Sequence, residues 1–321
     1  MISRFIKNII LFLSYATLCY ALFVIAWTYF VPFNFLKKNA IYLLGAKGFT
    51  FSRMVEAKSI ENVDILFLGS SHAYRSFDPR IYSENDIKSF NLGSPSQSPI
   101  QTKLLVQNFI DRLNPKLVIY EVYPATFQSD GLESALDIIA NSEDLSNGFE
   151  MVIAVNHIKV YNALIIDSFR EILDLNEGFV EETKNNYDVY VKGGFVETTL
   201  TQNVSPITEA IKQKWKSKSW EVKKQQWRAF KETLEILRQH QVEVMLVQTP
   251  VTSEAYELYI NNDEMDSLFR QEAKYYNFNN SIELNDSLDF ADYHHLNQRG
   301  VNKLNVELLN MIKQGNYFTR N

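Results

Sequence analysis

Residues 63–72 read VDILFLGSSH, a nearly uninterrupted apolar run that ends in a glycine, two serines and a histidine. A run of this kind is typical of a strand buried on both faces of a parallel sheet. Residues 116–123 (KLVIYEVY) and 242–249 (VEVMLVQT) have the same character, and residues 87–93 form a shorter relative. The sequence therefore predicts a sheet of several parallel strands.

Helical patterns separate these apolar runs. Apolar side chains recur at helical spacing in three segments, at residues 101–113, 220–237 and 297–312. The alternation of strands and helices predicts an α/β protein with a flavodoxin-like, doubly wound parallel sheet. In such a sheet, a functional site is expected beyond the carboxyl ends of the strands.

The connection over residues 125–241 is much longer than an ordinary crossover between parallel strands. It contains an expected helix at residues 157–175 and an expected hairpin, with strands at residues 187–191 and 195–200 around a Gly-Gly turn. The connection is either an insertion that covers the site or an extra layer packed on the edge of the sheet. The α/β domain as a whole is expected over residues 61–321.

The N-terminal residues 9–31 contain no charged side chain over 23 positions. A helix of this length covers the roughly 30 Å hydrocarbon core of a bilayer. A cleaved signal peptide is the alternative, but its apolar region would be shorter and no clear small-x-small cleavage site follows. We therefore expect a single-pass membrane anchor in residues 1–36, followed by a connecting segment over residues 37–60. Basic residues flank both ends of the helix about equally, so their distribution leaves the orientation open.

Charge is unevenly distributed along the chain. Residues 1–50 hold five basic residues and no acidic one, whereas the other 271 residues hold 27 basic and 38 acidic residues. An acidic body is a poor electrostatic partner for nucleic acid, so general DNA or RNA binding is excluded. The single cysteine excludes an intramolecular disulfide and a cysteine-rich zinc site. The sequence has no phosphate-binding loop, dinucleotide fingerprint, zinc motif or calcium loop, so we expect neither a metal nor a cofactor.

Three short segments carry residues suited to serine catalysis. Ser71 follows Gly69 at the end of the first expected strand, which places a hydroxyl at the carboxyl edge of the sheet. Asp292 lies three residues before His295, and a carboxylate at this spacing can orient an imidazole that activates a serine. Gly93 follows the second strand, where a backbone N–H can approach a substrate oxygen closely. Further candidates for the pocket are His72, Asn91, Gln97, Tyr123 and His294.

Each assignment has a plainer alternative. Ser71 can be a turn residue or helix cap. His294 is the neighbour that competes with His295 for the role of base, and the spacing from Asp292 favours His295. His72 can pack or cap as readily as it can contact a substrate.

Together these segments resemble the SGNH/GDSL hydrolase superfamily. The matching pieces are Gly69 to Ser71, Gly93, and Asp292-x-x-His295, and they occur in the order and spread of that family. The resemblance implies an SGNH-type three-layer α/β/α domain, with Ser71 as nucleophile, His295 as base and Asp292 as the residue that orients the base. It also implies that the backbone N–H groups of Ser71 and Gly93 donate to the oxyanion.

The sequence departs from this family at two positions. Ser70 stands where the family usually has aspartate, and the third strand ends in EVYP without the asparagine that usually donates to the oxyanion. Tyr123 and Asn91 are the candidates to replace that donor. With the anchor, these departures resemble a membrane-anchored branch that includes proteins of surface-polysaccharide O-acetylation and teichoic-acid D-alanylation. That resemblance implies a domain outside the cytoplasm, a glycan or acylated polymer as substrate, and a multi-span membrane acyltransferase as partner.

The function expected from the sequence is that of a membrane-anchored serine esterase or O-acyltransferase acting on a cell-surface glycan or related polymer. The first alternative is a catalytically degenerate fold that binds a polymer or a membrane partner, because the asparagine donor is missing. The second alternative is a lipase or thioesterase that faces the cytoplasm, because the orientation is open.

Overall fold

The computed structural model describes residues 2–32, 44–45, 48–142, 145–200, 218–279, 281–315 and 317. Its contacts divide the chain into two compact units, which are described separately. One unit combines Met1–Leu44 with Ala135–Phe179, and the other combines Gly45–Ser134 with Val180–Asn321. The expected connecting segment at residues 37–60 lies partly outside the described residues, and its second half contains helix α3 (Thr50–Ser59).

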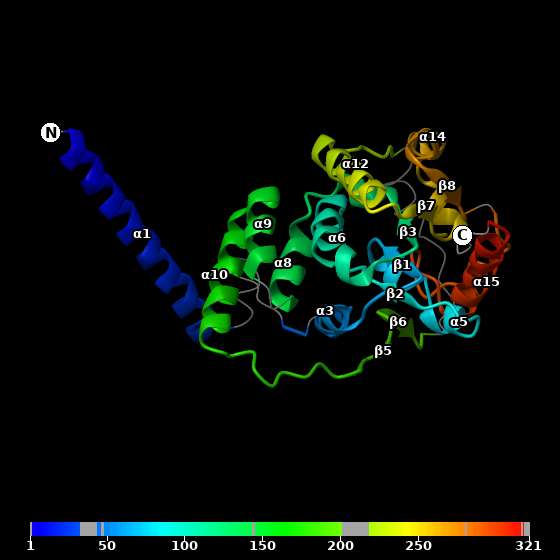
Figure 1. Cartoon of the computed structure of the whole chain (residues 1–321), viewed down its shortest axis with the longest axis horizontal. Helices are drawn as coiled ribbons and strands as arrows, with labels where there is room; N and C mark the ends of the chain where they lie inside the picture. The colour runs from blue at the N-terminus through cyan, green and yellow to red at the C-terminus, as the bar shows by residue number, and fades with distance from the viewer. Residues whose placement is uncertain are drawn as a thin grey trace. The chain divides into compact units, whose positions relative to one another are not determined.

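The larger unit is built on a five-stranded, entirely parallel sheet with strand order β2-β1-β3-β7-β8 (Figure 1). The α/β class and the parallel sheet expected from the sequence are confirmed. The strands are β1 (Ile65–Leu68), β2 (Ser89–Asn91), β3 (Leu117–Glu121), β7 (Glu243–Gln248) and β8 (Lys274–Asn277). Strand β8 is not predicted by the sequence, because this edge strand reads KYYN and lacks an apolar run.

Helices cover both faces of the sheet. Alternate residues of the central strands, such as Ile65 and Phe67, pack with α15 (Gln298–Gln314) through Leu304 and Leu308. The opposite face is covered by α6 (Pro99–Leu113) and α12 (Lys224–Gln239), and the ring of Tyr120 in β3 contacts that of Phe230 in α12 with centroids 5.5 Å apart. Figure 1 shows α6 with α12 on one side of the strands and α15 with α5 on the other. The remaining bounds are α4 (Ser71–Tyr74), α5 (Pro79–Ser83), α7 (Pro124–Gln128), α13 (Ser253–Glu257) and α14 (Asn262–Glu272).

The expected hairpin forms part of a small antiparallel sheet in the larger unit. Its strands are β4 (Lys184–Asn185), β5 (Asp188–Val191) and β6 (Phe195–Thr198). The N–H of Asn91 donates to the carbonyl of Gly193 at 2.8 Å, and Phe195 is buried in the core beside the sheet. The hairpin therefore packs at the β2 edge of the parallel sheet.

The described part of the smaller unit is built mainly from helices. It contains α1 (Ile2–Phe30), most of α8 (Leu132–Asn141), α9 (Leu145–Val155) and α10 (Ile158–Ile172). Within α1, Arg4–Phe30 is long and apolar enough to cross a membrane by length and composition, and its most apolar 18 residues have a mean hydropathy of 2.3. Helix α1 begins before the charge-free stretch, and its first two turns include the basic residues Arg4 and Lys7. The connection expected as one insertion is thus divided between the two units, and residues 201–217 of it lie outside the described residues.

Candidate active site

Ser71 lies at the turn between β1 and α4. The strand ends at Leu68, and Gly69 then adopts φ 138°, a conformation that suits glycine. A Cβ on Gly69 would come within 2.8 Å of the Cβ of Glu121, so the turn also needs a residue without a side chain. Ser70 caps α4 by accepting a hydrogen bond from the N–H of His72 at 3.3 Å. Ser71 is the first residue of α4, so its N–H is one of the first-turn donors that no carbonyl of the helix accepts.

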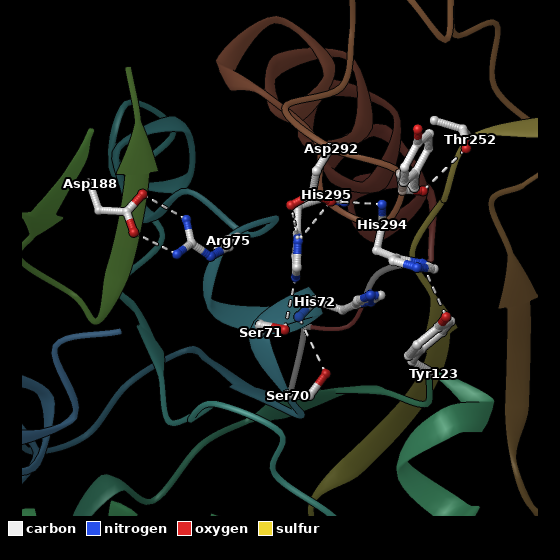
Figure 2. Close-up of polar contacts among 11 residues, drawn as sticks. Ser70, Ser71, His72, Arg75, Tyr123, Asp188, Thr252, Asp292, His294 and His295 are labelled. Carbon is white, nitrogen blue, oxygen red and sulfur yellow. Dashed lines mark hydrogen bonds and ion pairs between the residues drawn. The ribbon is translucent and has the colours of Figure 1, made fainter. Parts of the chain in front are cut away.

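The structure brings Ser71, His295 and Asp292 together in one chain of hydrogen bonds (Figure 2). The Nε2 atom of His295 lies 2.9 Å from the Oγ of Ser71, and its Nδ1 lies 2.8 Å from an Asp292 carboxylate oxygen. With the proton on Nδ1, His295 donates to Asp292 and accepts the hydroxyl proton of Ser71. This is the arrangement in which an imidazole can take a proton from a serine nucleophile.

The loop that carries Asp292 and His295 holds the carboxylate in place. One oxygen of Asp292 accepts the N–H groups of His294 at 2.8 Å and of His295 at 2.9 Å. Burial by itself would raise the pKa of Asp292, but its hydrogen bond with His295, the charge of His295 and these N–H groups together hold the pKa below its usual range. Thr252, after β7, donates its N–H and its hydroxyl to the carbonyl of Tyr293, at 3.0 and 3.2 Å. Asp292 is therefore an ionised, oriented acceptor for His295.

Two further histidines flank His295. The ring of His72 packs against that of Tyr123 with centroids 3.9 Å apart and a tilt of 38°, and it meets His295 edge-on at 5.0 Å. Burial, followed by the charges of His295 and His294, lowers the pKa of His72 well below its ordinary value. His294 places Nδ1 3.3 Å from the hydroxyl of Tyr123, and burial lowers its pKa as well. The lowered pKa values favour the uncharged form of both neighbours.

Asn91 and Gly93 lie against the nucleophile turn. A Cβ on Gly93 would come within 2.9 Å of the carbonyl oxygen of Gly69, which explains why glycine suits this position. The Gly93 N–H donates to the side-chain oxygen of Asn91 at 3.0 Å, and the Asn91 amide donates to the carbonyl of Ala73 at 2.8 Å. Asn91 thus ties the end of β2 to α4. Gln97 is buried, and its amide donates to Thr102 in α6.

Neither the partner of Arg75 nor the burial of Glu121 is predicted by the sequence. The guanidinium of Arg75, just after α4, binds both carboxylate oxygens of Asp188 in β5, at 2.9 and 2.6 Å (Figure 2). Glu121 at the end of β3 is 2% exposed and accepts the hydroxyl of Thr249 at 3.4 Å. Burial raises the pKa of Glu121 to about 8. The sequence signal for Glu121 was an acidic residue inside the apolar run 116–123. The ion pair of Arg75 with Asp188 joins residues 113 positions apart, so no local sequence pattern indicated it.

Among the described residues, no group of three or more histidine, cysteine, aspartate or glutamate side chains is placed to hold a metal ion. Fold and site together define an α/β protein with a Ser–His–Asp triad at the carboxyl edge of its parallel sheet.

Comparison with known proteins adds little to this definition. No family model matches the chain, and the comparison with curated proteins found no match. Among solved structures, the chain is similar to a "putative acylhydrolase" from Bacteroides fragilis, with 9% sequence identity and a TM-score of 0.39. The match covers 82% of this chain and 95% of that one. At this level the likeness carries no argument about activity, so the site must be interpreted from its own geometry.

Proposed function

We propose that this protein is a membrane-anchored serine esterase or O-acyltransferase that forms an acyl-enzyme on Ser71. The observation that carries this proposal is the continuous chain of hydrogen bonds from Ser71 through His295 to Asp292. A serine, a neutral imidazole and an ionised carboxylate in this order are the groups that acyl transfer requires.

Each step of the proposed reaction balances within the triad. The Oγ of Ser71 attacks the carbonyl carbon of an acyl ester while His295 takes the hydroxyl proton. The tetrahedral intermediate then collapses, the ester C–O bond breaks, and His295 returns the proton to the departing alcohol. Water or a sugar hydroxyl next gives its proton to His295 and attacks the carbonyl carbon of the acyl-enzyme. This second tetrahedral intermediate collapses, the bond between the acyl carbon and the Oγ of Ser71 breaks, and His295 returns the proton to that Oγ. Hydrolysis and transfer differ only in this last acceptor.

The developing oxyanion needs donors at the nucleophile turn. The Ser71 N–H is in place at the start of α4. The Gly93 N–H now donates to the side-chain oxygen of Asn91. It can also donate to the oxyanion if the oxyanion displaces that oxygen or if the N–H is shared between the two acceptors. Tyr123 follows β3, where the resembled family has asparagine, and its hydroxyl is a third donor if it turns from His294. His72 and His294 line the same side of Ser71 in Figure 2 and complete the proposed pocket.

The resemblance of the motifs to the membrane-anchored SGNH branch supports the proposed setting. The apolar helix α1 would anchor the chain, and the α/β domain would lie outside the cytoplasm, at the cell surface or in the periplasm. The substrate would be an acylated glycan or related polymer. A multi-span membrane acyltransferase would be the partner that supplies acyl groups.

A fluorophosphonate probe tests the proposal on the full-length protein in detergent. Intact mass is read for wild type, Ser71→Ala and His295→Ala, with Ser70→Ala as the matched control on the adjacent serine. We expect one adduct on wild type and on Ser70→Ala, none on Ser71→Ala, and strongly slowed labelling of His295→Ala. No adduct on folded wild type, or an adduct that survives Ser71→Ala, would contradict the acyl-enzyme mechanism.

One observation favours a second candidate, a degenerate fold that binds a polymer or a membrane partner. The Gly93 N–H is occupied by Asn91, and the sequence EVYP after β3 supplies no asparagine donor. Losing one oxyanion donor costs about a hundredfold to a thousandfold in rate. This candidate predicts polymer or partner binding that persists in Ser71→Ala, together with no adduct on wild type.

A further inference from the structure

Glu121 is the last residue of β3, the central strand of the parallel sheet. On one side of it, a Cβ added to Gly69 after β1 would come within 2.8 Å of the Glu121 Cβ. On the other side, the hydroxyl of Thr249 after β7 donates to the Oε1 atom of Glu121 at 3.4 Å. The carboxyl group therefore lies among the ends of three adjacent strands, against the turn that carries Ser71.

The surroundings of this carboxyl favour its neutral form. Its second oxygen, Oε2, is buried and has no hydrogen-bond partner among the described residues. In the same part of the chain, no basic side chain forms an ion pair with it. An unpaired charge buried in this way is costly, whereas a buried neutral carboxyl costs much less. Burial accordingly raises the pKa of Glu121 to about 8, against the opposing interactions with Thr249 and with the N–H groups of Tyr123 and Ser70.

Each segment that interacts with this carboxyl continues into a part of the proposed active site. Ser70 immediately precedes the nucleophile, and Tyr123 is one of the proposed oxyanion donors. Thr249 leads to Thr252, which holds the loop of the catalytic histidine. Glu121 is thus the one side chain that interacts with all three segments.

The charge of this carboxyl bears on the oxyanion of acyl transfer. The N–H of Ser71 is the first proposed oxyanion donor, and the N–H of the residue before it interacts with Glu121. A neutral carboxyl adds no negative charge to this turn. An ionised carboxyl repels an oxyanion that forms nearby, and the screening of that repulsion is weak because the group is buried.

We propose that Glu121 is a positioning residue for acyl transfer, whose neutral carboxyl supports the turn that carries Ser71 and whose ionisation turns the site into a slow form. This role rests on the proposed acyl-enzyme at Ser71, and it adds a residue outside the triad to the groups that control the reaction.

The other titratable groups around the site change charge in other pH ranges. Tyr120 and Tyr123 interact electrostatically with Glu121, and burial raises the pKa of both above the ordinary tyrosine value. Burial lowers the pKa of His72 and of His294, so both rings lose a proton at lower pH. A fall in rate as pH rises through about 8 is therefore the signature expected of Glu121.

The pH dependence of fluorophosphonate labelling, measured from pH 6 to 9.5 on the full-length protein in detergent, tests this role. The phosphoryl oxygen of the probe gains negative charge as an acyl oxyanion does. Wild type is compared with Glu121→Gln, which keeps the shape but cannot ionise, and with Thr249→Val, which removes a hydrogen bond that favours the ionised form. Glu243→Gln is the matched control, because it changes an exposed carboxyl at the start of β7. Circular dichroism at each pH monitors the fold.

We expect the wild-type rate at pH 9 to be about tenfold below its maximum, because a group with a pKa of about 8 is then mostly ionised. Glu121→Gln should keep its rate within about twofold from pH 8 to pH 9. Thr249→Val should lose rate only at a higher pH than wild type, since the pKa of Glu121 rises when this hydrogen bond is removed. Glu243→Gln should follow wild type. Because Thr249→Val retains Glu121, the role can be tested even if Glu121→Gln does not fold.

A fall with the same midpoint in Glu121→Gln, or a wild-type rate that stays level up to pH 9.5, would overturn the role of Glu121 and leave the acyl-enzyme intact. Loss of the folded signal over the same pH range as the loss of rate would also overturn it, since unfolding would then account for the profile. No labelling of folded wild type at any pH would overturn the acyl-enzyme and the role of Glu121 together.

Discussion

At the residue scale, the surroundings of His295 set the charge states of three neighbouring groups. Hydrogen bonds and the nearby imidazole keep Asp292 ionised, whereas burial keeps His72 and His294 neutral. A cation at either neighbour would repel the imidazolium that forms on His295. Among these three histidines, His295 is the one whose ring contacts Ser71 and can take its proton.

The Asp292→Asn variant measures how much this carboxylate contributes. An amide cannot balance the imidazolium and favours the wrong tautomer of His295, so we expect labelling of Ser71 to slow by about 10³–10⁴-fold. His294→Gln is the control, since His294 contacts Tyr123 rather than Ser71, and we expect a loss below about tenfold from a lost neutral hydrogen bond. Rates of fluorophosphonate labelling give both values. An unchanged rate in Asp292→Asn would show that the triad geometry is not used.

Glu121 makes stability depend on pH. Its pKa rises from 4.5 to about 8 on folding, so the folded state holds its proton more tightly than the unfolded state. The stabilisation from this proton is complete below pH 4.5 and is lost as pH rises through about 8. We expect Glu121→Gln to gain stability relative to wild type between pH 5 and pH 8.5, by a few kcal/mol, because one pKa unit corresponds to about 1.4 kcal/mol. Denaturant unfolding at both pH values measures this gain, and exposed Glu243→Gln serves as control. An equal difference from wild type at both pH values would refute it.

At the element scale, parallel strands bring the site residues to one edge of the sheet. Ser71 follows β1, Gly93 follows β2 and Tyr123 follows β3, while the segment after β7 holds the loop with Asp292 and His295 through Thr252. The hairpin adds a second support, because Asp188 in β5 binds Arg75 at the end of α4. The short helix that begins at Ser71 is therefore held from both sides.

The Arg75–Asp188 pair offers a prediction about this support. Both side chains are largely buried, so removing one leaves a charge without its partner. We expect Arg75→Met to destabilise the hairpin by about 1.5–3 kcal/mol, the usual range for a hydrogen bond to a charged group. Hydrogen exchange should then speed up across β5 and β6. Lys116→Met, which breaks the more exposed pair with Asp64, is the control and should cost less than about 1 kcal/mol. Unchanged exchange in β5 and β6 would show that the pair does not hold the hairpin.

At the scale of the whole molecule, the chemistry and the apolar helices belong to different units. Every residue of the triad lies in the unit formed by Gly45–Ser134 and Val180–Asn321. The helices α9 and α10 belong instead with α1. The long connection between β3 and β7 therefore contributes the β5–β6 hairpin to the larger unit and helices α9 and α10 to the smaller unit.

This division predicts the behaviour of a chain that starts at Gly45. Its Ser71 should still react with the probe, because no triad residue is removed. The chain should nevertheless self-associate without detergent, since removing α1 uncovers Ile166 and adds to the apolar surface of α9 and α10. Light scattering with and without detergent measures the association. A monodisperse monomer in plain buffer would contradict the prediction.

The sequence by itself determined the features that rest on local patterns. Apolar runs located four of the five parallel strands, the charge-free stretch located α1, and short spacings singled out Ser71, Asp292 and His295 as candidates. These features are readable because burial on both faces, membrane length and short-range spacing each leave a repeating or contiguous mark in the chain. The exposed edge strand β8 left no such mark.

Only the tertiary structure decided which distant residues meet. In the folded chain, Arg75 pairs with Asp188 and Glu121 lies against the nucleophile turn. The Gly93 N–H donates to Asn91, and α10 packs against α1. Contacts of this kind join residues from separate elements, and their geometry follows from how whole helices and strands pack. No local pattern encodes them, because each partner is a common residue type whose role depends on what the fold brings beside it.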